Sequence, residues 1–456
     1  MRIELEIPLS LREISVAANG KHSCHNKTVY AITTHSKMVK PNDLFIALKG
    51  ELSSGEFYVD EAREKGAIIL SQNQTLADIY CTDTRIALLN IAKLYKSKLK
   101  NLKTTVAITG SVGKTTTKNI TAAMLAQKYK VHSTSGNFNN SIGVAYTLLS
   151  APKNTEALVL ELGMNHKGEI SELSHAANPD ISVITNIGTA HIGYLGTKEN
   201  IANAKLEILD GMKYPILIAP FEESLLKKVK NLYTYSLINS ATDCFIDVIK
   251  ENSDSSVFDV HTNSFYLKSR TVSLAGRHIL NAVACGISVM DLLKTEPELI
   301  ERGIASLNDY CIRQKIIPIS DFFLYDDSYN SSPEAVIAAF QSPVFKDRPH
   351  SCVLGDMLEL GIESERLHTK IGEAAVKYGF EKIYAFGNYS DCIARGAVNN
   401  GLNPNDVFVY KDTDDFKKIA DSIMRHHTRN EIILLKASHA LRADRIKDEL
   451  QNMITK

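Results

Sequence analysis

The sequence predicts an α/β protein of three domains. Its 456 residues exceed what one hydrophobic core usually supports, so several domains are expected. Short apolar runs alternate with helix-forming segments along most of the chain, a pattern typical of mostly parallel sheets covered by helices. A glycine-rich turn at 109–116 joins one such run to a helix. We expect a small N-terminal α/β domain over 1–102, a central domain with a mostly parallel sheet over 103–312, and a second doubly wound sheet over 313–456.

The N-terminal domain is predicted from two compact apolar runs, which read as strands at Leu44–Leu48 and Gly66–Leu70. The charged segment Tyr58–Lys65 between them favours a helix. Apolar residues recur at helical spacing over Ile86–Leu99, so we expect a helix there that leads into the next domain.

The central domain is predicted from apolar strands separated by helical stretches: Val106–Thr109, Leu158–Glu161, Ile181–Asn186 and Ile216–Ala219. Sheets of this kind bind ligands at the carboxyl ends of their strands, and the notable polar residues here fall at those ends. Short β-rich pieces at Ser256–Val260 and Ser264–Leu267 predict an antiparallel extension of the same domain. A helix is expected over Ile279–Leu293.

The C-terminal third shows another α/β alternation, in which charged amphipathic helices separate short apolar runs. These runs predict a second doubly wound sheet with strands at Phe322–Tyr325, Cys352–Leu354, Ile383–Phe386, Val407–Tyr410 and Ile432–Leu435.

Composition excludes several classes of protein. Lysine plus arginine and aspartate plus glutamate each total 52, so the chain lacks the basic charge expected of a nucleic-acid binder. Its seven cysteines are scattered and never form a Cys-x-x-Cys pair, which favours reduced thiols over a zinc site or disulfides. The opening MRIELEIPLS does not resemble a signal peptide, and no apolar run is long enough to span a membrane. We expect a cytoplasmic protein without membrane insertion.

The stretch Thr105–Thr117 predicts a phosphate-binding loop that binds ATP. Glycines let the backbone N–H groups turn inward, the start of the following helix adds partial positive charge, and Lys114 can reach the β- and γ-phosphates. The spacing is not a strict Walker A motif, because Ile108 stands where its first glycine belongs. The alternative is a plain strand-to-helix connection. The residues expected to hold the nucleotide are Gly110, Ser111, Val112, Gly113, Lys114, Thr115 and Thr116.

Three polar residues, Glu161, Asn186 and His191, lie at or just after the ends of predicted strands. A lone carboxylate such as Glu161 is usually solvated or capping, but beside a phosphate loop it is a natural Mg²⁺ ligand, with the Thr115 hydroxyl as a second donor. Asn186 and His191 follow the third strand, although an isolated histidine is more often structural. Lys205 lies in a predicted helix, and no spacing argument singles it out.

Several long segments in a fixed order resemble the Mur ligase family. They are TGSVGKTTTK, TSGNFNNSIGV, ELGMNHKGEISELS and ITNIGTAHIGYLGTKENIANAKLEI, together with Gly276–Asn281, Asp327–Pro333 and Val353–Gly361. The resemblance covers the central and C-terminal parts well and the N-terminal part more loosely. It implies an N-terminal domain for a UDP-sugar, a central ATPase domain and a C-terminal Rossmann-like domain for the amine substrate.

The resemblance also implies a reaction in peptidoglycan precursor synthesis. ATP and Mg²⁺ would convert the terminal carboxylate of UDP-N-acetylmuramoyl-tripeptide to an acyl phosphate, which the amine of D-alanyl-D-alanine would attack. Negative charge grows on phosphate oxygens in both steps, so positioning, Lys114 and Mg²⁺ would supply much of the catalysis. A monomer is the family expectation.

By the same resemblance, Lys114, His191 and Lys205 would be catalytic, and Lys205 matches a lysine that is carbamylated. Thr115 and Glu161 would bind one Mg²⁺, with His191 and Lys205 at a second. The nucleotide would also contact Asn281, Arg313, Asp327, Tyr329 and Asn330. The substrates would contact Ser36, Lys37, Asn137, Asn139, Asn140, Asn186, Lys436 and Ser438. Taken alone, an asparagine-rich loop is also ordinary turn chemistry.

Departures from the family pattern leave other functions open. Ser36-Lys37 stands where an arginine usually follows the serine, and Ala437 replaces a usual glycine between Lys436 and Ser438. The main alternative is a Mur-ligase-like paralogue that joins a different carboxylate and amine. A P-loop kinase and a nucleotide-binding interaction protein without catalysis are weaker alternatives, the latter because all five expected catalytic and metal residues are present.

Overall fold

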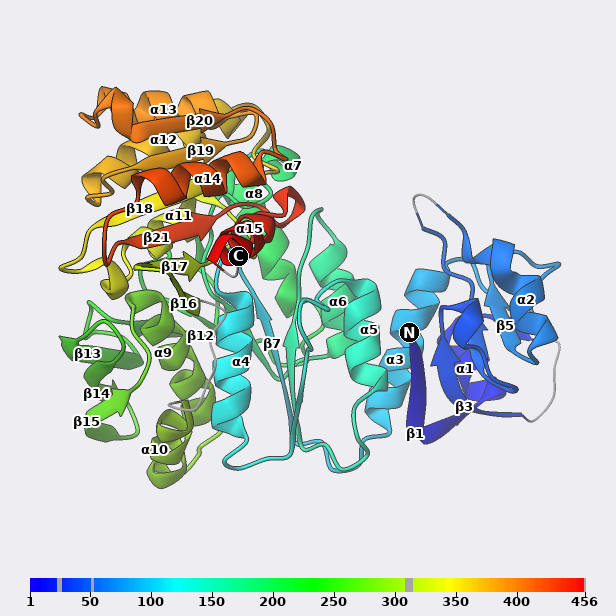
Figure 1. Cartoon of the computed structure of the whole chain (residues 1–456). Coiled ribbons are helices and arrows are strands. Elements are labelled where there is room, and N and C mark those ends of the chain that lie inside the picture. Colours follow the sequence, from blue (N-terminus) through cyan, green and yellow to red (C-terminus); the bar gives the residue numbers. More distant parts are fainter. Residues whose placement is uncertain (23–26, 51–52, 308–314, 455–456) are drawn as a thin grey trace.

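The computed structural model describes residues 1–22, 27–50, 53–307 and 315–454 (Figure 1). These residues form three separate sheets with flanking helices, and most strand pairs within the sheets are parallel. The predicted α/β class is therefore confirmed. The predicted limit at 102/103 falls between a helix and a strand, and the limit at 312/313 lies outside the described residues, so both limits stay predictions.

The N-terminal sheet has the strand order β1-β3-β4-β5-β6-β2. Its strands are β1 (Arg2–Ser10), β2 (Lys21–His22), β3 (Thr28–Thr33), β4 (Leu44–Ile46), β5 (Ile68–Ser71) and β6 (Ile79–Tyr80). Its helices are α1 (Leu11–Ala17), α2 (Val59–Glu64) and α3 (Thr84–Ser97). Asp83 caps α3 by accepting the N–H groups of Arg85 and Ile86. Because α3 packs on helices of the central domain, it joins the two domains through a shared apolar core.

The central sheet has the order β15-β14-β13-β12-β11-β10-β7-β9-β8. Its strands are β7 (Thr104–Thr109), β8 (Val131–Ser133), β9 (Ala157–Glu161), β10 (Ile181–Ile184), β11 (Leu217–Pro220), β12 (Leu232–Ser236), β13 (Cys244–Glu251), β14 (Ser256–Thr262) and β15 (Tyr266–Val272). The predicted antiparallel extension is confirmed, because β13 to β15 pair antiparallel. The helices are α4 (Lys114–Leu125), α5 (Ser141–Leu149), α6 (Glu169–Ala177), α7 (Ile192–Leu195), α8 (Lys198–Leu206), α9 (Arg277–Leu292) and α10 (Pro297–Ser306).

Both faces of the central sheet are covered, and this explains its continuous apolar strands. Val106 and Ile108 pack with α4 and α9 on one face, while Ala107 and Leu158 pack with α3, α5 and α6 on the other. Each fully buried aliphatic side chain contributes roughly 1.5–3 kcal/mol relative to an exposed one. Burial of both faces fixes the carboxyl edge of the sheet, where the phosphate loop begins.

The C-terminal sheet has the order β16-β17-β21-β18-β19-β20 and is parallel except at β16. Its strands are β16 (Lys315–Ile319), β17 (Phe322–Asp326), β18 (His350–Gly355), β19 (Ile383–Phe386), β20 (Val407–Tyr410) and β21 (Ile432–Lys436). Its helices are α11 (Pro333–Phe340), α12 (Ser364–Lys377), α13 (Ser390–Asn399), α14 (Phe416–His426) and α15 (Asp444–Ile454). All five strands predicted here are present.

The domains are arranged so that the C-terminal one reaches the carboxyl edge of the central sheet. In Figure 1 the C-terminal domain, coloured yellow to red, lies above the central domain, and α7 lies at its border. A 3₁₀ turn at Gly361–Glu363 contacts α7 directly. The blue N-terminal domain lies on the other side of α3 and α5 (Figure 1). In the described parts of the chain, every helix is too short or too polar to cross a bilayer.

Candidate active site

The predicted phosphate loop joins β7 to α4 through two glycines with positive φ, Gly110 at 150° and Gly113 at 83°. A Cβ atom on Gly110 would lie 1.9 Å from Thr185 Oγ1, so this position has no room for a side chain. Asn186 Oδ1 accepts the backbone N–H groups of Ser111 and Val112 at 3.1 and 2.9 Å. The sequence predicts a substrate contact for Asn186. In the structure it holds the loop, and the substrate contact stays a prediction.

The first turn of α4 brings a lysine, a threonine and a buried carboxylate together. Lys114 Nζ donates to the carbonyl oxygen of Gly110 at 2.8 Å. Thr115 Oγ1 donates to Glu161 Oε2 at 2.7 Å, and Asn139 Nδ2 donates to Glu161 Oε1 at 2.8 Å. Helix N–H groups at this end have no acceptor within the helix, so they can bind phosphate oxygens.

The donors at this turn fit Mg²⁺. Glu161 supplies a carboxylate that is only 2% exposed, and Thr115 supplies a hydroxyl next to it. Within the described residues there is no group of three or more His, Cys, Asp or Glu side chains that could hold a metal. Mg²⁺ commonly needs only one or two carboxylates when phosphate oxygens and waters complete its shell. Such a site would be complete only with a nucleotide bound.

His191 lies at the junction with the C-terminal domain. Its φ of 66° is left-handed, which is uncommon for a residue with a side chain. Its Nδ1 atom lies 2.6 Å from Glu359 Oε2. The close contact with His191 lowers the pKa of Glu359, and burial of that carboxyl opposes the shift in part. The structure thus pairs His191 with an acidic residue that the sequence-based site did not include.

Lys205 is enclosed at the end of α8, with 1% of its surface exposed. Burial lowers its pKa well below the ordinary value, and repulsion from Lys114 lowers it further. Among the described residues, none accepts a hydrogen bond from its Nζ atom. A buried ammonium without an acceptor is costly, so the neutral amine is favoured here.

Two predicted nucleotide residues of the C-terminal domain, Asp327 and Asn330, contact Lys436. Its Nζ atom donates to Asp327 Oδ2 at 2.7 Å and to the carbonyl oxygen of Asn330 at 3.0 Å. The ring of Tyr329 lies 5.6 Å from that of His439. Three predicted residues are therefore neighbours, although Lys436 is engaged by Asp327 and its predicted substrate contact stays a prediction.

Other predicted residues lie apart from this group or serve local structure. Ser438 Oγ accepts the N–H of Leu358 at 2.9 Å, and Asn140 caps α5 by accepting the N–H of Gly143. Asn281 is half-buried in α9, and Asn137 is exposed. Arg313 lies outside the described residues.

In the N-terminal domain, Ser36 Oγ donates to Glu61 Oε2 at 2.6 Å, and the adjacent Lys37 is exposed. Lys65 Nζ donates both to Glu61 Oε1 at 2.7 Å and to the carbonyl oxygen of Ser36 at 3.0 Å. Two lysines, Lys37 and Lys65, are therefore close to Ser36. The roles of Ser36 and Lys37 with a substrate stay predictions.

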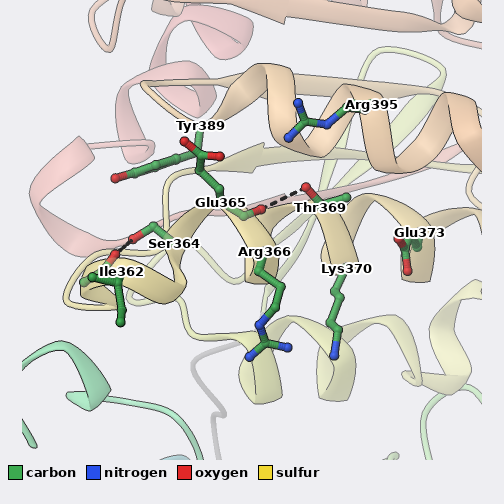
Figure 2. A pocket seen from close by; sticks show the side chains of 10 residues that line it. Ile362, Ser364, Glu365, Arg366, Thr369, Lys370, Glu373, Tyr389 and Arg395 are labelled. Atoms are coloured by element: carbon green, nitrogen blue, oxygen red, sulfur yellow. Dashed lines mark hydrogen bonds between the residues drawn. The ribbon is translucent and has the colours of Figure 1, made fainter. Parts of the chain in front are cut away.

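A cavity of about 620 Å³ lies on the C-terminal domain between α12 and α13 (Figure 2). Arg366 and Lys370 point to the same side of α12, whereas Arg395 comes from α13 (Figure 2). The cavity is lined by Gly361, Ile362, Ser364, Glu365, Arg366, Thr369, Lys370, Glu373, Tyr389 and Arg395. None of the predicted nucleotide, metal or substrate residues lines it, so it is separate from the phosphate loop.

His368 stabilises the loop that carries Glu359. Its Nε2 atom accepts the N–H of Met357 at 2.8 Å, and its Nδ1 atom donates to the carbonyl oxygen of Ser364 at 2.7 Å. The contact at Nε2 requires the neutral imidazole, because a protonated Nε2 cannot accept a hydrogen bond. Burial lowers the pKa of His368, so the folded chain resists its protonation.

Acidification is therefore expected to destabilise the fold through His368. Unfolded histidine titrates at pH ~6.5, so below that pH the unfolded chain gains a proton that the folded chain lacks, at a cost of at most about 1.4 kcal/mol per pH unit. The stabilisation is complete above that pH and is lost as the pH falls toward the lowered folded pKa. The measurement is the thermal unfolding midpoint across this range. His368→Gln is expected to show a shallower fall, and an identical fall would refute the assignment.

The buried parallel sheet, its glycine loop and the Thr115–Glu161 pair define a nucleotide-binding protein of the phosphate-loop class. Two family descriptions match the chain, "Mur ligase middle domain" over residues 108–289 and "Mur ligase, glutamate ligase domain" over residues 312–439. The chain belongs to the Mur ligase family.

Named relatives match over most of their length. The UDP-N-acetylmuramoyl-tripeptide–D-alanyl-D-alanine ligase of Bacillus subtilis (strain 168) is 33% identical over 437 residues, which cover 92% of this chain and 93% of the relative. The protein of the same name from Escherichia coli (strain K12) is 32% identical over 411 residues, covering 85% of this chain and 88% of the relative.

Solved structures show the same architecture. MurF from Acinetobacter baumannii superposes with a TM-score of 0.88 at 25% identity, covering 98% of this chain and all of that one (100%). The MurF ligase from Thermotoga maritima, in complex with ADP, has a TM-score of 0.80 at 28% identity, covering 93% and 97% of the two chains. The family resemblance predicted from the sequence motifs is thus confirmed.

Proposed function

We propose that this chain is an ATP-dependent ligase that adds D-alanyl-D-alanine to UDP-N-acetylmuramoyl-tripeptide through an acyl phosphate. The observation that carries the proposal is its similarity, across about nine-tenths of both chains, to a relative named for that reaction. The site supports it, because Lys114, Thr115 and Glu161 lie at the carboxyl edge of the central sheet, where a nucleotide phosphate would bind.

Each site residue has a role in this proposal. The N–H groups at the start of α4 and the Lys114 ammonium bind the phosphates and compensate the charge that grows during transfer. Thr115 and Glu161 hold Mg²⁺, which when bound would neutralise the phosphate oxygens. His191 belongs to a second metal site. Asn281, Arg313, Asp327, Tyr329 and Asn330 complete the nucleotide site, while Ser36, Lys37, Asn137, Asn139, Asn140, Asn186, Lys436 and Ser438 serve the other substrates.

Lys205 acts as a carbamate in this proposal. Its neutral amine adds to carbon dioxide, forming an N–C bond and releasing one proton, so that an anionic oxygen donor replaces an ammonium. The surroundings support the step, because burial and the nearby Lys114 both lower the pKa of Lys205. A neutral amine is the form that reacts, and the product is an oxygen ligand that Mg²⁺ prefers.

Phosphate release from ATP and Mg²⁺ tests the function directly. With UDP-N-acetylmuramoyl-tripeptide and D-alanyl-D-alanine together, we expect turnover and a product heavier by the dipeptide minus water. Omission of either substrate should stop the reaction. Turnover only with another carboxylate and amine would establish the paralogue alternative, which the unusual Ser36-Lys37 segment favours. Product formation that needs no amine would indicate a kinase.

Three further features belong to the proposal. A monomer is proposed, since the family expectation is one chain with all three substrate-binding domains. The cytoplasm is proposed as its compartment, because the reaction consumes ATP and a UDP-linked precursor. The domain limits are proposed at 102/103 and 312/313, with the N-terminal domain for the UDP-sugar and the C-terminal one for the amine.

A further inference from the structure

One loop of the central domain lies between the phosphate loop and the C-terminal domain. It begins at Asn186, shortly after β10, and extends to Gly193 in the first turn of α7. On one side Gly188 N–H donates to Ser111 Oγ at 2.8 Å, in addition to the contacts of Asn186 with the phosphate loop. A shift of this loop would therefore move the backbone that is expected to hold ATP.

On its other side the same loop meets two carboxylates of the C-terminal domain. Glu334, in the first turn of α11, accepts the Thr189 N–H at 2.8 Å and the Thr189 hydroxyl at 3.1 Å. Glu359 lies 2.6 Å from His191 Nδ1, and its backbone oxygen accepts the Gly193 N–H at 2.9 Å. Four polar contacts thus fix a short loop to another domain.

The backbone at these contacts is shaped for close approach. A Cβ atom on Gly188 would lie 2.7 Å from Glu334 Cδ, and one on Gly193 would lie 2.7 Å from the Glu359 oxygen. His191 and Glu359 both have φ of 66°, in the left-handed region. Such conformations cost free energy and persist where surrounding contacts impose them. His191 and Glu359 are both strained and contact each other across the domain border. This indicates that the contact between the domains is specific and imposes both conformations.

We propose that Glu334 and Glu359 form an interdomain latch, which holds His191 and the 186–193 loop in the position that the phosphate loop needs for catalysis. The effect of the latch on catalysis rests on the proposed function, whereas the contacts themselves do not. Glu334 and Glu359 are positioning residues in this account. When the C-terminal domain docks, the latch orders the nucleotide site, so that phosphate transfer is coupled to arrival of the domain that carries the amine.

Glu359→Ala and Glu334→Ala test the latch, with Glu363→Ala as the matched control. Glu363 lies in the same loop region, but its ion pair is with Arg366 of its own domain. We expect each latch variant to lower kcat by about 10- to 100-fold with a small change in KM for ATP, since misplacement of reacting groups by about 1 Å can cost 100-fold. The double variant should lose less than the product of the two single losses, because both residues hold one loop. Glu359→Gln should recover part of the loss, since its amide oxygen can still accept from His191.

Hydrogen exchange separates the latch from the assigned reaction. In the ligand-free chain, the Thr189 and Gly193 amides should exchange faster in the alanine variants and not in Glu363→Ala. Unchanged exchange would overturn the latch, even if the chain proved inactive with the proposed substrates. Faster exchange with a wild-type kcat would also overturn it, because the contact would then be structural only. An inactive wild type would instead refute the proposed substrates.

Discussion

Lys205→Ala is expected to lower kcat by about 10- to 100-fold, the scale on which loss of groups that support a metal acts. The physical reason is the buried amine. Its surroundings disfavour the ammonium, and the described residues give it no acceptor, so its environment suits a carbamate. Alanine cannot form one. Millimolar acetate or formate should restore part of the turnover by placing a carboxylate in the vacated space.

Lys205→Met is the matched control for folding, because methionine fills most of the space of lysine without an amine. We expect it to keep the thermal midpoint and to lose turnover as Lys205→Ala does. Carbon NMR with labelled bicarbonate should show a carbamate signal in the wild type that both variants lack. Full turnover in Lys205→Ala would remove the lysine from the mechanism.

The fold was largely predictable where strands are buried on both faces. Such strands are continuous apolar runs, and the buried strand Ile383–Phe386 has the predicted bounds. Several strands that sequence reasoning missed, such as β1, β8 and β16, lie at sheet edges, but β3 (Thr28–Thr33) was missed as well although it lies inside its sheet. β1 at Arg2–Ser10 is half-buried and irregular in its pairing, and β16 contains Pro318, which only an edge strand tolerates.

The site was predictable where its residues are local or follow a strand. The phosphate loop is one continuous segment, and Glu161 was expected beside it because parallel strands end at the same edge. Glu334 was missed because its partner, Thr189, is 145 positions away along the chain. Contacts between domains depend on how folded surfaces dock, which local patterns do not encode. Glu359 lies within Val353–Gly361, one of the segments that resemble the Mur ligase family. That resemblance was the one sequence feature that could have pointed to Glu359.

The spacing of apolar residues along the sequence could not predict that Lys205 is buried. A lysine in a charged helix usually faces solvent, and α8 has too weak an apolar stripe to show which side is inward. Only the packed structure shows that Lys205 is enclosed and close enough to Lys114 for their charges to interact. The family resemblance and the burial therefore support its role independently.

Lys114→Met is expected to lower kcat by about 100- to 1,000-fold, the cost of removing one group that stabilises charge in a transition state. The Lys114 ammonium lies over the loop, within 2.8 Å of the Gly110 oxygen and 3.3 Å of the Ser111 oxygen. Methionine keeps a chain of similar length, so the helix should form as before. Lys128→Met is the control. Lys128 follows the C-terminal end of α4, away from the phosphate loop, and pairs with Glu296.

The same substitution has a second consequence through Lys205. Repulsion from Lys114 is one of the two causes that lower the pKa of Lys205, so its removal should raise that pKa and leave less neutral amine. The residual turnover of Lys114→Met should then depend more steeply on bicarbonate than that of the wild type. Equal bicarbonate dependence would show that the two lysines act independently. Wild-type phosphate release by Lys114→Met would show that the Lys114 ammonium does not contribute to phosphate transfer.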